Sequence, residues 1–349
     1  MKEYHFIEKL WYPALRYRSL IYYLFWMLSF PFLLLVKLKY FLYRSGLLKS
    51  NAFSKPVIVV GNLSVGGTGK TPFIATLVSL LSAQNIKCGI VSRGYQSSVR
   101  KCPHQVTDSD TSSSVGDESF MQYSKLNIPI VIDADRSNAV KYLIEHNDID
   151  IVISDDGLQH YKMQRDLEVV LMDSSRAFGN KLVMPFGPLR EPISRCQSID
   201  LVIKNGNCPV GSEIENLVSE QVDIVPNQFV NLNTNQKIEL DKLSKHSVFA
   251  IAGIGNPNRF YSTLKKIVNI SETKTFKDHH QFCKVDFESF NYSEGELAPV
   301  IMTEKDAVKC KCFAKKNWYY LEVDMPFNKN LNDNLLSRIQ KIIERQSDE

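Results

Sequence analysis

The chain has 349 residues and a formal net charge of +4; 23% of its residues are charged and 44% are hydrophobic. Its length is about twice the commonest domain size, so two domains sharing a cleft are expected. The composition is close to globular averages, which argues against a disordered, fibrous or multi-spanning membrane protein. Because residues 1–50 hold eight Lys/Arg and two Glu, the excess positive charge lies there. That placement favours an anionic membrane surface as a partner and not nucleic acid.

The N-terminal part contains seventeen consecutive uncharged residues, 20–36, with Pro31 among them. As a helix this run would be about 25 Å long, just short of a comfortable bilayer span. Basic residues flank it on both sides: Arg16, Arg18, Lys37 and Lys39. We therefore expect residues 1–50 to form a membrane-associated helical segment, whether it spans the bilayer or lies in it. A buried core helix and a cleaved signal peptide are the alternatives, although no small-residue cleavage site follows the run.

The next part of the chain alternates strand-like and helix-like patterns. Strands are expected at 57–60, 87–92, 149–153 and 167–173, and helices at 72–83 and 139–145, with a Ser/Asp/Thr-rich loop between residues 96 and 115. Such alternation predicts an α/β fold of the P-loop NTPase type, with a parallel sheet covered by helices on both faces.

After about residue 206 the periodicity weakens, and a second β/α series begins. Its expected strands are 247–252, 300–303 and 319–323, and a closing helix is expected near 332–344. We therefore expect three parts: the N-terminal segment 1–50, a nucleotide-binding core 51–240, and a smaller α/β domain 241–349 that contributes to the active-site cleft.

A phosphate-binding loop follows the first strand. It comprises Ser64, Val65, Gly66, Gly67, Thr68, Gly69, Lys70 and Thr71. Glycines let backbone N–H groups approach phosphate oxygens, lysine offsets the β/γ charge, and a hydroxyl binds Mg²⁺. Ser64 stands where the usual pattern has its first glycine. The strand before the loop and the helix after it supply the context the motif needs, so we expect the phosphates of a nucleotide and Mg²⁺ to bind here.

A second acidic element ends the expected strand 149–153. Asp155 and Asp156 follow it directly. A carboxylate at the end of a neighbouring strand is where such sites hold Mg²⁺, directly or through water. The same pair could instead cap a turn at Gly157.

Seven motifs, in this order behind an apolar basic N-terminus, resemble the tetraacyldisaccharide 4′-kinase family: GNLSVGGTGKTP (61–72), SRGY (92–95), GDE (116–118), DDGLQH (155–160), PFGPLREP (185–192), DHHQF (278–282) and TEKDAVK (303–309). The resemblance spans nearly the whole chain, and Ser64 looks usual for that family. It implies transfer of the γ-phosphate of ATP to the 4′-hydroxyl of an acylated glucosamine disaccharide 1-phosphate, which makes lipid IVA in lipid A synthesis. It also implies a place at the cytoplasmic face of the inner membrane, with no obligate protein partner evident.

The resemblance further implies roles for single residues. Lys70 and Thr71 would serve the phosphates and the metal, with Asp155 or Asp156 completing the Mg²⁺ site. Asp117 matches the base for the sugar hydroxyl, and His279 or His280 would be its partner. From the residues alone, Asp117 could equally be the N-cap of a helix beginning near Ser119, and the two histidines could lie on an ordinary surface loop.

Four further residues are candidates on weaker grounds. Arg190 is expected to reach a phosphate of ATP or of the lipid, since a planar guanidinium suits either, and Glu191 is expected at the metal. His160 and Arg93 are expected to contact the substrate. A rigid turn at 190–191 and a structural histidine at 160 are the alternatives.

Two other functions use the same loop. A membrane-tethered nucleotide switch or partitioning-type ATPase would hydrolyse ATP without transferring phosphate. A soluble biosynthetic kinase or synthetase would have no need of residues 20–36. The stretch 303–306, TEKD, only superficially resembles the base-reading N-K-x-D element of GTPases because it lacks Lys at the second position.

Overall fold

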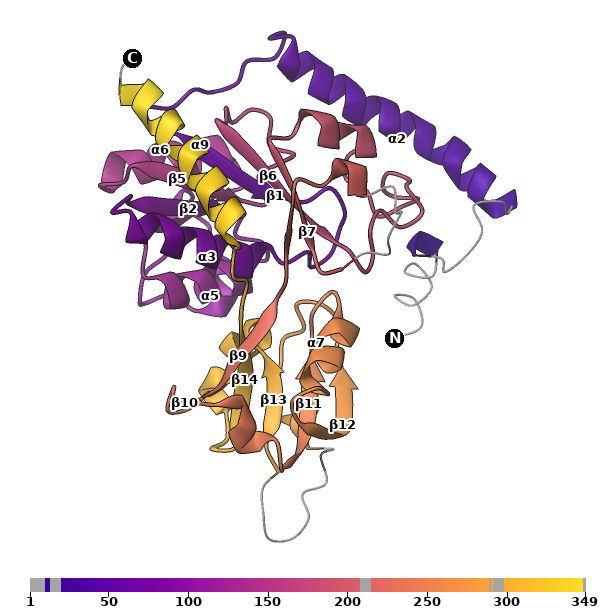
Figure 1. The fold of residues 1–349 in the computed structure, drawn as a ribbon, viewed down its shortest axis with the longest axis vertical. Helices are drawn as coiled ribbons and strands as arrows, with labels where there is room; N and C mark the ends of the chain where they lie inside the picture. Colours follow the sequence, from indigo (N-terminus) through magenta and orange to yellow (C-terminus); the bar gives the residue numbers. More distant parts are fainter. Residues whose placement is uncertain (1–9, 13–19, 208–214, 289, 291–297, 348–349) are drawn as a thin grey trace. The chain divides into compact units, whose positions relative to one another are not determined.

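The computed structural model describes residues 10–12, 20–207, 215–288, 290 and 298–347. The chain folds into two compact units. Unit 1 comprises Met1–Arg93, Pro129–Asp223 and Phe327–Glu349, and unit 2 comprises Gly94–Ile128 and Ile224–Pro326. Figure 1 shows the elements of both units. Arg16 and Arg18, expected to flank the apolar segment, lie outside the described residues.

Unit 1 is built on a parallel sheet whose strands are buried along nearly their whole length. Runs of Val, Ile and Leu form it, as is usual for strands covered on both faces. The strands lie in the order β4-β2-β5-β1-β6-β7-β8, and their bounds are β1 Val57–Gly61, β2 Cys88–Ser92, β4 Ile130–Ile132, β5 Ile151–Asp155, β6 Leu167–Asp173, β7 Leu201–Asn205 and β8 Glu220–Val222.

Helices cover both faces of this sheet, which confirms the expected fold class. The helical elements of unit 1 are α2 Leu20–Arg44, α3 Lys70–Ala83, α6 Arg136–His146, η1 Ile193–Ser198, η2 Glu215–Leu217 and α9 Lys329–Ser347. The connection β1–α3–β2 runs along the sheet in the opposite direction to β4–α6–β5. Because both crossovers between parallel strands are expected to be right-handed, the two helices lie on opposite faces.

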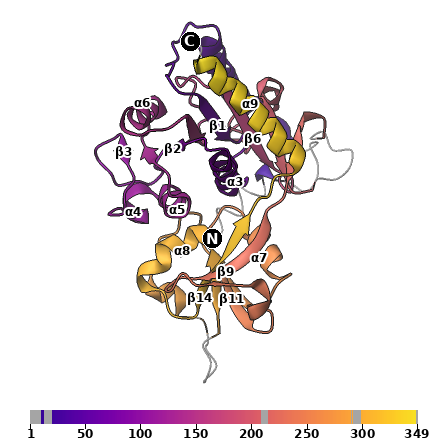
Figure 2. The same cartoon turned by 60° about the vertical axis from the view of Figure 1, so that its left-hand side comes forward.

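The last helix of the chain belongs to unit 1. Figures 1 and 2 show α9, in yellow, lying along the parallel sheet. Its Leu331, Leu335 and Ile339 are fully buried, and Phe327, just before it, packs on Phe73 of α3 with ring centroids 4.8 Å apart.

Helix α2 is longer than the apolar run predicted, since it continues through the basic residues to Arg44. It packs on the rest of unit 1 through aromatic contacts, with Phe25 and Phe32 both against Phe186 and Tyr40 against Tyr161. Residues Tyr22–Arg44 are long and apolar enough to cross a membrane, and only 6% of the apolar window is buried. The outer face carries large exposed apolar side chains along its whole length, so the buried core helix considered above does not describe it.

Unit 2 is a second α/β unit with a mixed sheet. Its strands lie in the order β10-β9-β14-β13-β11-β12, where β14, β13, β11 and β12 are parallel and β9 and β10 are antiparallel to their neighbours. The strand bounds are β9 Val225–Asn231, β10 Lys237–Ile238, β11 Ser247–Ala252, β12 Asn269–Thr275, β13 Val300–Thr303 and β14 Trp318–Asp324. The remaining elements of the unit are β3 His104–Gln105, α4 Ser112–Val115, α5 Asp117–Leu126, η3 Leu240–Leu243, α7 Pro257–Leu264, η4 Lys284–Phe287, α8 Glu304–Cys310 and η5 Lys311–Phe313.

The two units do not follow the boundaries expected at residues 240 and 241. Residues 94–128 leave unit 1 between β2 and β4, and α5 packs on α8 within unit 2. Conversely, the chain returns to unit 1 at Phe327. These assignments depend on contacts between residues far apart in the sequence, which local patterns do not reveal.

The stretch between residues 96 and 115 is also more ordered than the expected loop. It contains β3 and α4, and Thr111 caps α4 in a reciprocal capping box with Ser114. Asp110 accepts hydrogen bonds from the backbone N–H and hydroxyl of Thr107 and lies 3.0 Å from Nε2 of His104. The polar composition that suggested a loop therefore supplies side-chain bonds to the backbone.

Candidate active site

The phosphate loop lies between the end of β1 and the start of α3, as its sequence predicts. Gly66 and Gly69 have φ angles of 112° and 94°, which a residue with a side chain rarely adopts. Asn62 lies beneath the loop and donates from Nδ2 to the carbonyl oxygens of Ser64 and Gly66, at 2.7 and 3.2 Å. Helix α3 begins at Lys70, so the N–H groups of its first turn face the loop and can receive phosphate oxygens.

Ser64, at the start of the phosphate loop, pairs through its backbone with another segment of unit 1. It forms an isolated antiparallel bridge with Leu189, and the N–H of Val65 donates to the carbonyl oxygen of Pro188 at 2.8 Å. The N–H of Arg190 in turn donates to the carbonyl oxygen of Leu63 at 2.7 Å. The motif PFGPLREP is thus paired with the phosphate loop along its backbone, which brings Arg190 to the site.

The acidic pair lies beside the loop because β5 pairs with β1. Asp155 is opposite Val60 in the register, and Asp156 follows with a φ of 53°. Lys70 Nζ lies 3.5 Å from Asp156 Oδ1, and Nη1 of Arg190 donates to both Asp156 oxygens at 2.8 and 2.7 Å. Burial acts to raise the pKa of Asp156, but the charges of Lys70 and Arg190 outweigh it and lower that pKa to about 2.

Two more arginines lie at the same edge of the sheet. Arg136, the first residue of α6, is buried and reaches the carbonyl oxygen of Asp155 with Nη2 at 3.5 Å. Burial lowers its pKa to about 10, against the raising effect of Asp155 and Asp156. Arg93 follows β2, is exposed, and its positive charge acts on Arg136. Among the described residues Arg93 has no carboxylate within 4.0 Å, so it is available to an anionic ligand.

The donor set at this edge fits a nucleotide with Mg²⁺. A hydroxyl from Thr71 and carboxylates from Asp155 and Asp156 are the oxygen ligands that Mg²⁺ prefers, with the remaining positions left to water and phosphate. The hydroxyl of Thr68 is buried and has no hydrogen-bond partner among the described side and main chains. An added Cβ at Gly67 would meet no protein atom within 4 Å, which leaves room for a ligand there.

Glu191 lies one layer behind this edge. One of its carboxylate oxygens accepts from Nε2 of Gln159 at 2.9 Å, and the other accepts from the hydroxyl of Tyr161. Arg195 Nε lies 3.4 Å from the second oxygen. Burial raises the pKa of Glu191 against these partners. Because both of its oxygens are already engaged, Glu191 is placed to support Gln159 and does not reach the phosphate loop. Oε1 of Gln159 in turn accepts a hydrogen bond from Arg190 at 3.4 Å.

His160 follows the DDGLQ stretch and is half-buried. Its Nε2 lies 3.4 Å from Oδ1 of Asp135, the N-cap of α6. Burial lowers its pKa, and the charge of Arg136 acts in the same direction. The structure therefore brings His160 near the phosphate-site edge through Arg136 and Asp135.

A second cluster of charged residues lies entirely within unit 2, around Asp117. This residue is 3% exposed and is the first residue of α5. Its cap is Gly116, so Asp117 is not the N-cap that the sequence also allowed. An added Cβ at Gly116 would lie 2.5 Å from the carbonyl oxygen of Tyr95, and its φ is 90°. Both facts call for glycine at this position.

The two adjacent histidines have different surroundings. His279 Nδ1 lies 3.3 Å from Asp117 Oδ2, and its ring packs on Tyr95 with centroids 4.9 Å apart. His280 instead places Nε2 2.9 Å from Asp286 and stacks on Phe276 at 4.5 Å. Of the pair, the structure brings only His279 to Asp117.

A lysine fixes the orientation of His279. Lys305 Nζ lies 3.1 Å from His279 Nε2 and also donates to Glu118 at 2.9 Å and Asp278 at 3.1 Å. Burial acts to lower the pKa of Lys305, but the two carboxylates outweigh it and raise that pKa, so the ammonium is charged. An ammonium can only donate hydrogen bonds. Nε2 must therefore accept, and the ring proton must reside on Nδ1, from which it is donated to Asp117.

A second lysine completes the cluster. Lys309 is almost fully buried, pairs with Asp306 at 2.9 Å and lies 3.7 Å from Asp117 Oδ2. Asp306 is itself held by the hydroxyl of Thr303 at 2.7 Å and the N–H of Gly253 at 2.8 Å. Asp117 thus faces one ammonium and one imidazole N–H.

The chain matches a family model described as "LpxK: Tetraacyldisaccharide-1-P 4'-kinase" over residues 21–340. Curated relatives named tetraacyldisaccharide 4′-kinase include one from Shewanella woodyi, 40% identical over 347 residues, which cover 97% of this chain and 96% of the relative. Another, from Haemophilus influenzae, is 44% identical over 307 residues, covering 86% of this chain and 88% of the relative.

A solved structure is also similar. It is the "apo" form of LpxK from Aquifex aeolicus in complex with ATP, with a TM-score of 0.73 and 26% identity over 90% of this chain and 97% of that one.

The chain belongs to the tetraacyldisaccharide 4′-kinase family.

Membership confirms the resemblance carried by the seven motifs. In this member of the family the motifs divide between the units. The phosphate loop, DDGLQH and PFGPLREP meet in unit 1, whereas GDE, DHHQF, TEKDAVK and Tyr95 of SRGY meet in unit 2.

Four charged residues of this family member were not singled out from the sequence. Lys305 and Lys309 lie four residues apart in TEKDAVK, and Glu118 lies in GDE, so the motifs contained them without assigning a role. Arg136 lies in no quoted motif. Only its burial and its contact with Asp155 reveal it.

Proposed function

We propose that the chain is an ATP-dependent kinase that transfers the γ-phosphate of ATP to the 4′-hydroxyl of tetraacyldisaccharide 1-phosphate, forming lipid IVA. Family membership supports this enzyme class. The observation that carries transfer over hydrolysis is the buried pair of Asp117 and His279. A carboxylate held by an imidazole is suited to accept the proton of an alcohol as its oxygen bonds to phosphorus.

In this proposal unit 1 holds the nucleotide. The N–H groups of the loop and of the first turn of α3 receive phosphate oxygens, and Lys70 offsets the charge of the β- and γ-phosphates. Thr71 with Asp155 or Asp156 would hold Mg²⁺, which when bound supplies charge neutralisation at the transferring phosphoryl group. Asp156 also keeps Lys70 and Arg190 in place before the nucleotide binds, through its two ion pairs.

Arg190 and Arg93 are proposed to contact anionic groups of the substrates. Arg190 needs only to exchange part of its bond to Asp156 for a phosphate oxygen, because the two are chemically similar acceptors. We propose that Glu191 supports Arg190 through Gln159 and that His160 contacts the acceptor sugar, with Arg136 and Asp135 fixing its position.

In unit 2, Asp117 is proposed as the base. Nδ1–H of His279 and the ammonium of Lys309 both hold Oδ2 of its carboxylate, so that the other oxygen, Oδ1, remains for the hydroxyl proton. Lys305 is proposed as a positioning residue, since it selects the His279 tautomer that donates to Asp117. Transfer requires Asp117 to reach a hydroxyl that faces the γ-phosphate. We therefore propose that unit 2 closes on the nucleotide held by unit 1 in the reacting complex.

Helix α2 is proposed to attach the enzyme to the inner membrane at its cytoplasmic face, where the acylated acceptor would be presented. Its exposed apolar side chains and its basic C-terminal turns suit a bilayer surface. We propose ATP and Mg²⁺ as the only further requirements, with no obligate protein partner.

The test uses the full-length chain in detergent with γ-labelled ATP, Mg²⁺ and tetraacyldisaccharide 1-phosphate, followed by chloroform/methanol extraction. We expect label in a lipid with one additional phosphate. Asp117→Asn, which keeps the size of the side chain, should bind ATP normally and lower turnover about 10²- to 10⁴-fold. Label found only in free phosphate would show that the chain hydrolyses ATP, and full turnover by Asp117→Asn would remove the base from the mechanism.

A further inference from the structure

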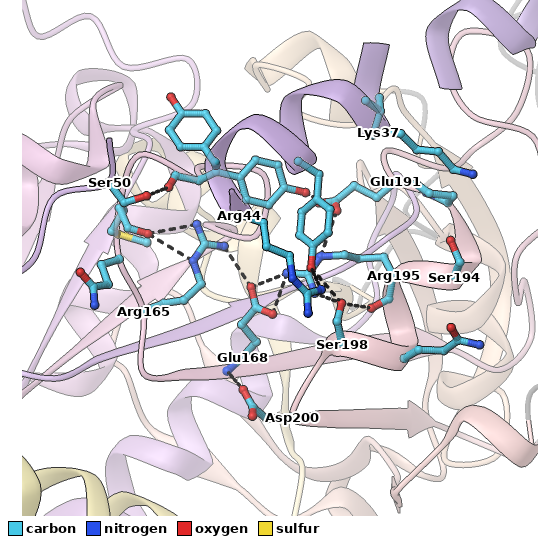
Figure 3. Close-up of a pocket in the computed structure, with 18 of the residues that line it drawn as sticks. Lys37, Arg44, Ser50, Arg165, Glu168, Glu191, Ser194, Arg195, Ser198 and Asp200 are labelled. Atoms are coloured by element: carbon cyan, nitrogen blue, oxygen red, sulfur yellow. Dashed lines mark hydrogen bonds and ion pairs between the residues drawn. The ribbon is translucent and has the colours of Figure 1, made fainter. Parts of the chain in front are cut away.

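A cavity of about 1020 Å³ lies in unit 1 between the C-terminal half of α2 and the core. Figure 3 shows its lining, with Arg44 reaching in from α2 toward Arg195 and Ser198, and Glu168 between Arg165 and Arg195. Sites for small organic ligands are commonly about 300–1,000 Å³. The cavity is therefore far larger than a single inorganic anion needs.

Cations surround two tyrosine rings in and beside this cavity. The guanidinium carbons of Arg44 and Arg195 lie 5.8 and 4.9 Å from the centroid of Tyr40. Around Tyr161, the guanidinium carbon of Arg165 lies at 5.4 Å and Nζ of Lys39 at 5.6 Å. Gathering like charges in this way is favourable only when anions are close to them.

The anions of the core account for the inner cations only. Glu168 pairs with Arg165 at 3.1 Å and with Arg195 at 2.5 Å. Glu191 is engaged by Tyr161, Gln159 and Arg195. The other two lining carboxylates bind backbone N–H groups, Asp166 that of Val57 and Asp200 that of Glu168, each at 2.8 Å.

The outer cations come from α2 and are not matched. Within the part of the chain that the structure describes, Lys37 and Arg44 have no carboxylate within 4.0 Å. Arg44 donates from Nη1 to the hydroxyl of Tyr40 at 2.9 Å, and that hydroxyl donates to Ser198 at 3.3 Å. A neutral hydroxyl does not offset the charge of a guanidinium. The mouth of the cavity, formed by Lys37 and Arg44 of α2, is therefore positively charged. At its floor, the charges of Arg165 and Arg195 are neutralised by the carboxylates of the core.

The same helix bears a large apolar surface. Trp26, Leu34, Leu38 and Phe41 are 52, 57, 48 and 60% exposed on α2. A ligand entering beside α2 therefore meets apolar side chains first and cations next, which is the order in which an acylated phosphate ester presents its chains and head group to a membrane surface.

We propose that this cavity binds the phosphate head of an acylated amphiphile, with Lys37 and Arg44 holding the phosphate and its chains lying along α2. Two membrane lipids share this chemistry: the 1-phosphate end of the acceptor and a resident anionic phospholipid. The first source rests on the proposed function, whereas the second does not.

Contact of Glu191 with Gln159 and of Gln159 with Arg190 links the cavity wall to the phosphate site.

The experiment compares the full-length chain with three variants. Lys37→Gln/Arg44→Gln removes two charges from the cavity mouth. Ser194→Trp places an indole at the lining and leaves the charge unchanged. Lys341→Gln/Arg345→Gln removes two exposed charges from α9, outside the cavity, and is the matched control. Each protein is assayed for the KM of the acceptor, for the KM of ATP, and for binding to phosphatidylcholine vesicles with and without phosphatidylglycerol.

We expect both cavity variants to show either a KM for the acceptor about tenfold higher or binding to phosphatidylglycerol vesicles about tenfold weaker. The α9 control should stay unchanged in both measurements. A raised KM for the acceptor alone, with the KM of ATP unaltered, would identify the acceptor's 1-phosphate. Weaker binding to phosphatidylglycerol vesicles alone would identify a resident phospholipid.

Two results would overturn the proposal. In one, both cavity variants match the unsubstituted chain in every readout. In the other, Lys37→Gln/Arg44→Gln and the α9 control lose vesicle binding equally, whereas Ser194→Trp does not. That pattern would mean that basic side chains are attracted to the anionic vesicle surface in general and that the cavity is not a binding site. Failure of the kinase proposal would appear separately, as an unsubstituted chain that labels no lipid, and the vesicle arm would still decide the fate of the cavity.

Discussion

The charged clusters of the two units use similar residues for different ends. In unit 1, Lys70 and Arg190 face Asp156 across a sheet edge that is open to a ligand, and the acid is only half-buried. In unit 2, Asp117 is buried and faces Lys309 and the imidazole of His279. The first arrangement can exchange its internal ion pairs for those of a phosphate, whereas the second holds one carboxylate in a fixed setting.

In the proposed mechanism, nucleotide binding and proton transfer are therefore built on separate folding units. Substitutions in unit 1 should therefore alter nucleotide binding, and substitutions in unit 2 should alter turnover with binding intact. Single substitutions in each unit can test that separation.

After Asp117→Asn, the largest effect is expected for Lys70→Ala in the phosphate loop. It removes the charge that faces the β- and γ-phosphates, so kcat/KM should fall about 10²- to 10³-fold and ATP affinity should fall as well. Steady-state kinetics and calorimetric titration of ATP measure the two effects. Unchanged ATP affinity would mean that the unit 1 cluster does not hold the nucleotide as we infer.

His279→Gln should lower turnover about tenfold or more without altering ATP affinity, because Asp117 loses its N–H donor. The neighbouring His280→Gln is the matched control. It loses a contact with Asp286 and a stacked ring, so it should cost about 1 kcal/mol of unfolding free energy and leave turnover unaltered. If His280→Gln were the slower enzyme, the assignment of the partner histidine would be reversed.

Lys305→Met should slow turnover by about threefold to tenfold, the size expected for one lost hydrogen bond. Nitrogen-15 NMR of labelled histidine should find the proton of His279 on Nδ1 in the unsubstituted chain and a mixture of tautomers in the variant. Lys316→Met, at an exposed position of unit 2, should change neither. A single tautomer retained in Lys305→Met would show that another group positions the ring.

The smallest effect concerns the stability of unit 1 in acid. The pKa of Asp156 is lowered from 3.8 to about 2, so its ion pairs stabilise the folded state above the unfolded pKa and are lost as the pH falls through about 2. Between pH 6 and pH 3 the contribution lost should be about 0.5 kcal/mol, allowing for solvent screening of a half-buried group. Asp156→Asn should therefore lose less unfolding free energy over that interval, as measured by denaturant titration. An equal loss in both proteins would mean that Asp156 is not held by Lys70 and Arg190.

The sequence predicted the elements of the fold well where a strand was short, apolar and flanked by turn residues. Leu167–Asp173, Ser247–Ala252 and Val300–Thr303 agree with the structure to the residue. Helix ends were less accurate because caps depend on geometry. The helix expected at residues 139–145 begins at Arg136, where the side chain of Asp135 caps it.

The site was less predictable than the fold. The local phosphate-loop motif carried its own context, but the contact of Asp117 with His279 joins residues 162 apart in the sequence, and only the family resemblance suggested it. Charged residues that act on other charged residues, such as Lys305 and Arg136, leave no local pattern, because a lysine or arginine in a helix is most often simply solvated.

The order in which the chain is made adds a constraint on when the enzyme can exist. The phosphate loop is synthesised before all of unit 2, yet the unit that contains it also requires Phe327 and the buried face of α9, which are made after unit 2. All of residues 224–326 must leave the ribosome before the first unit has its last helix. The earliest functional motif of the chain thus belongs to the unit whose assembly finishes last.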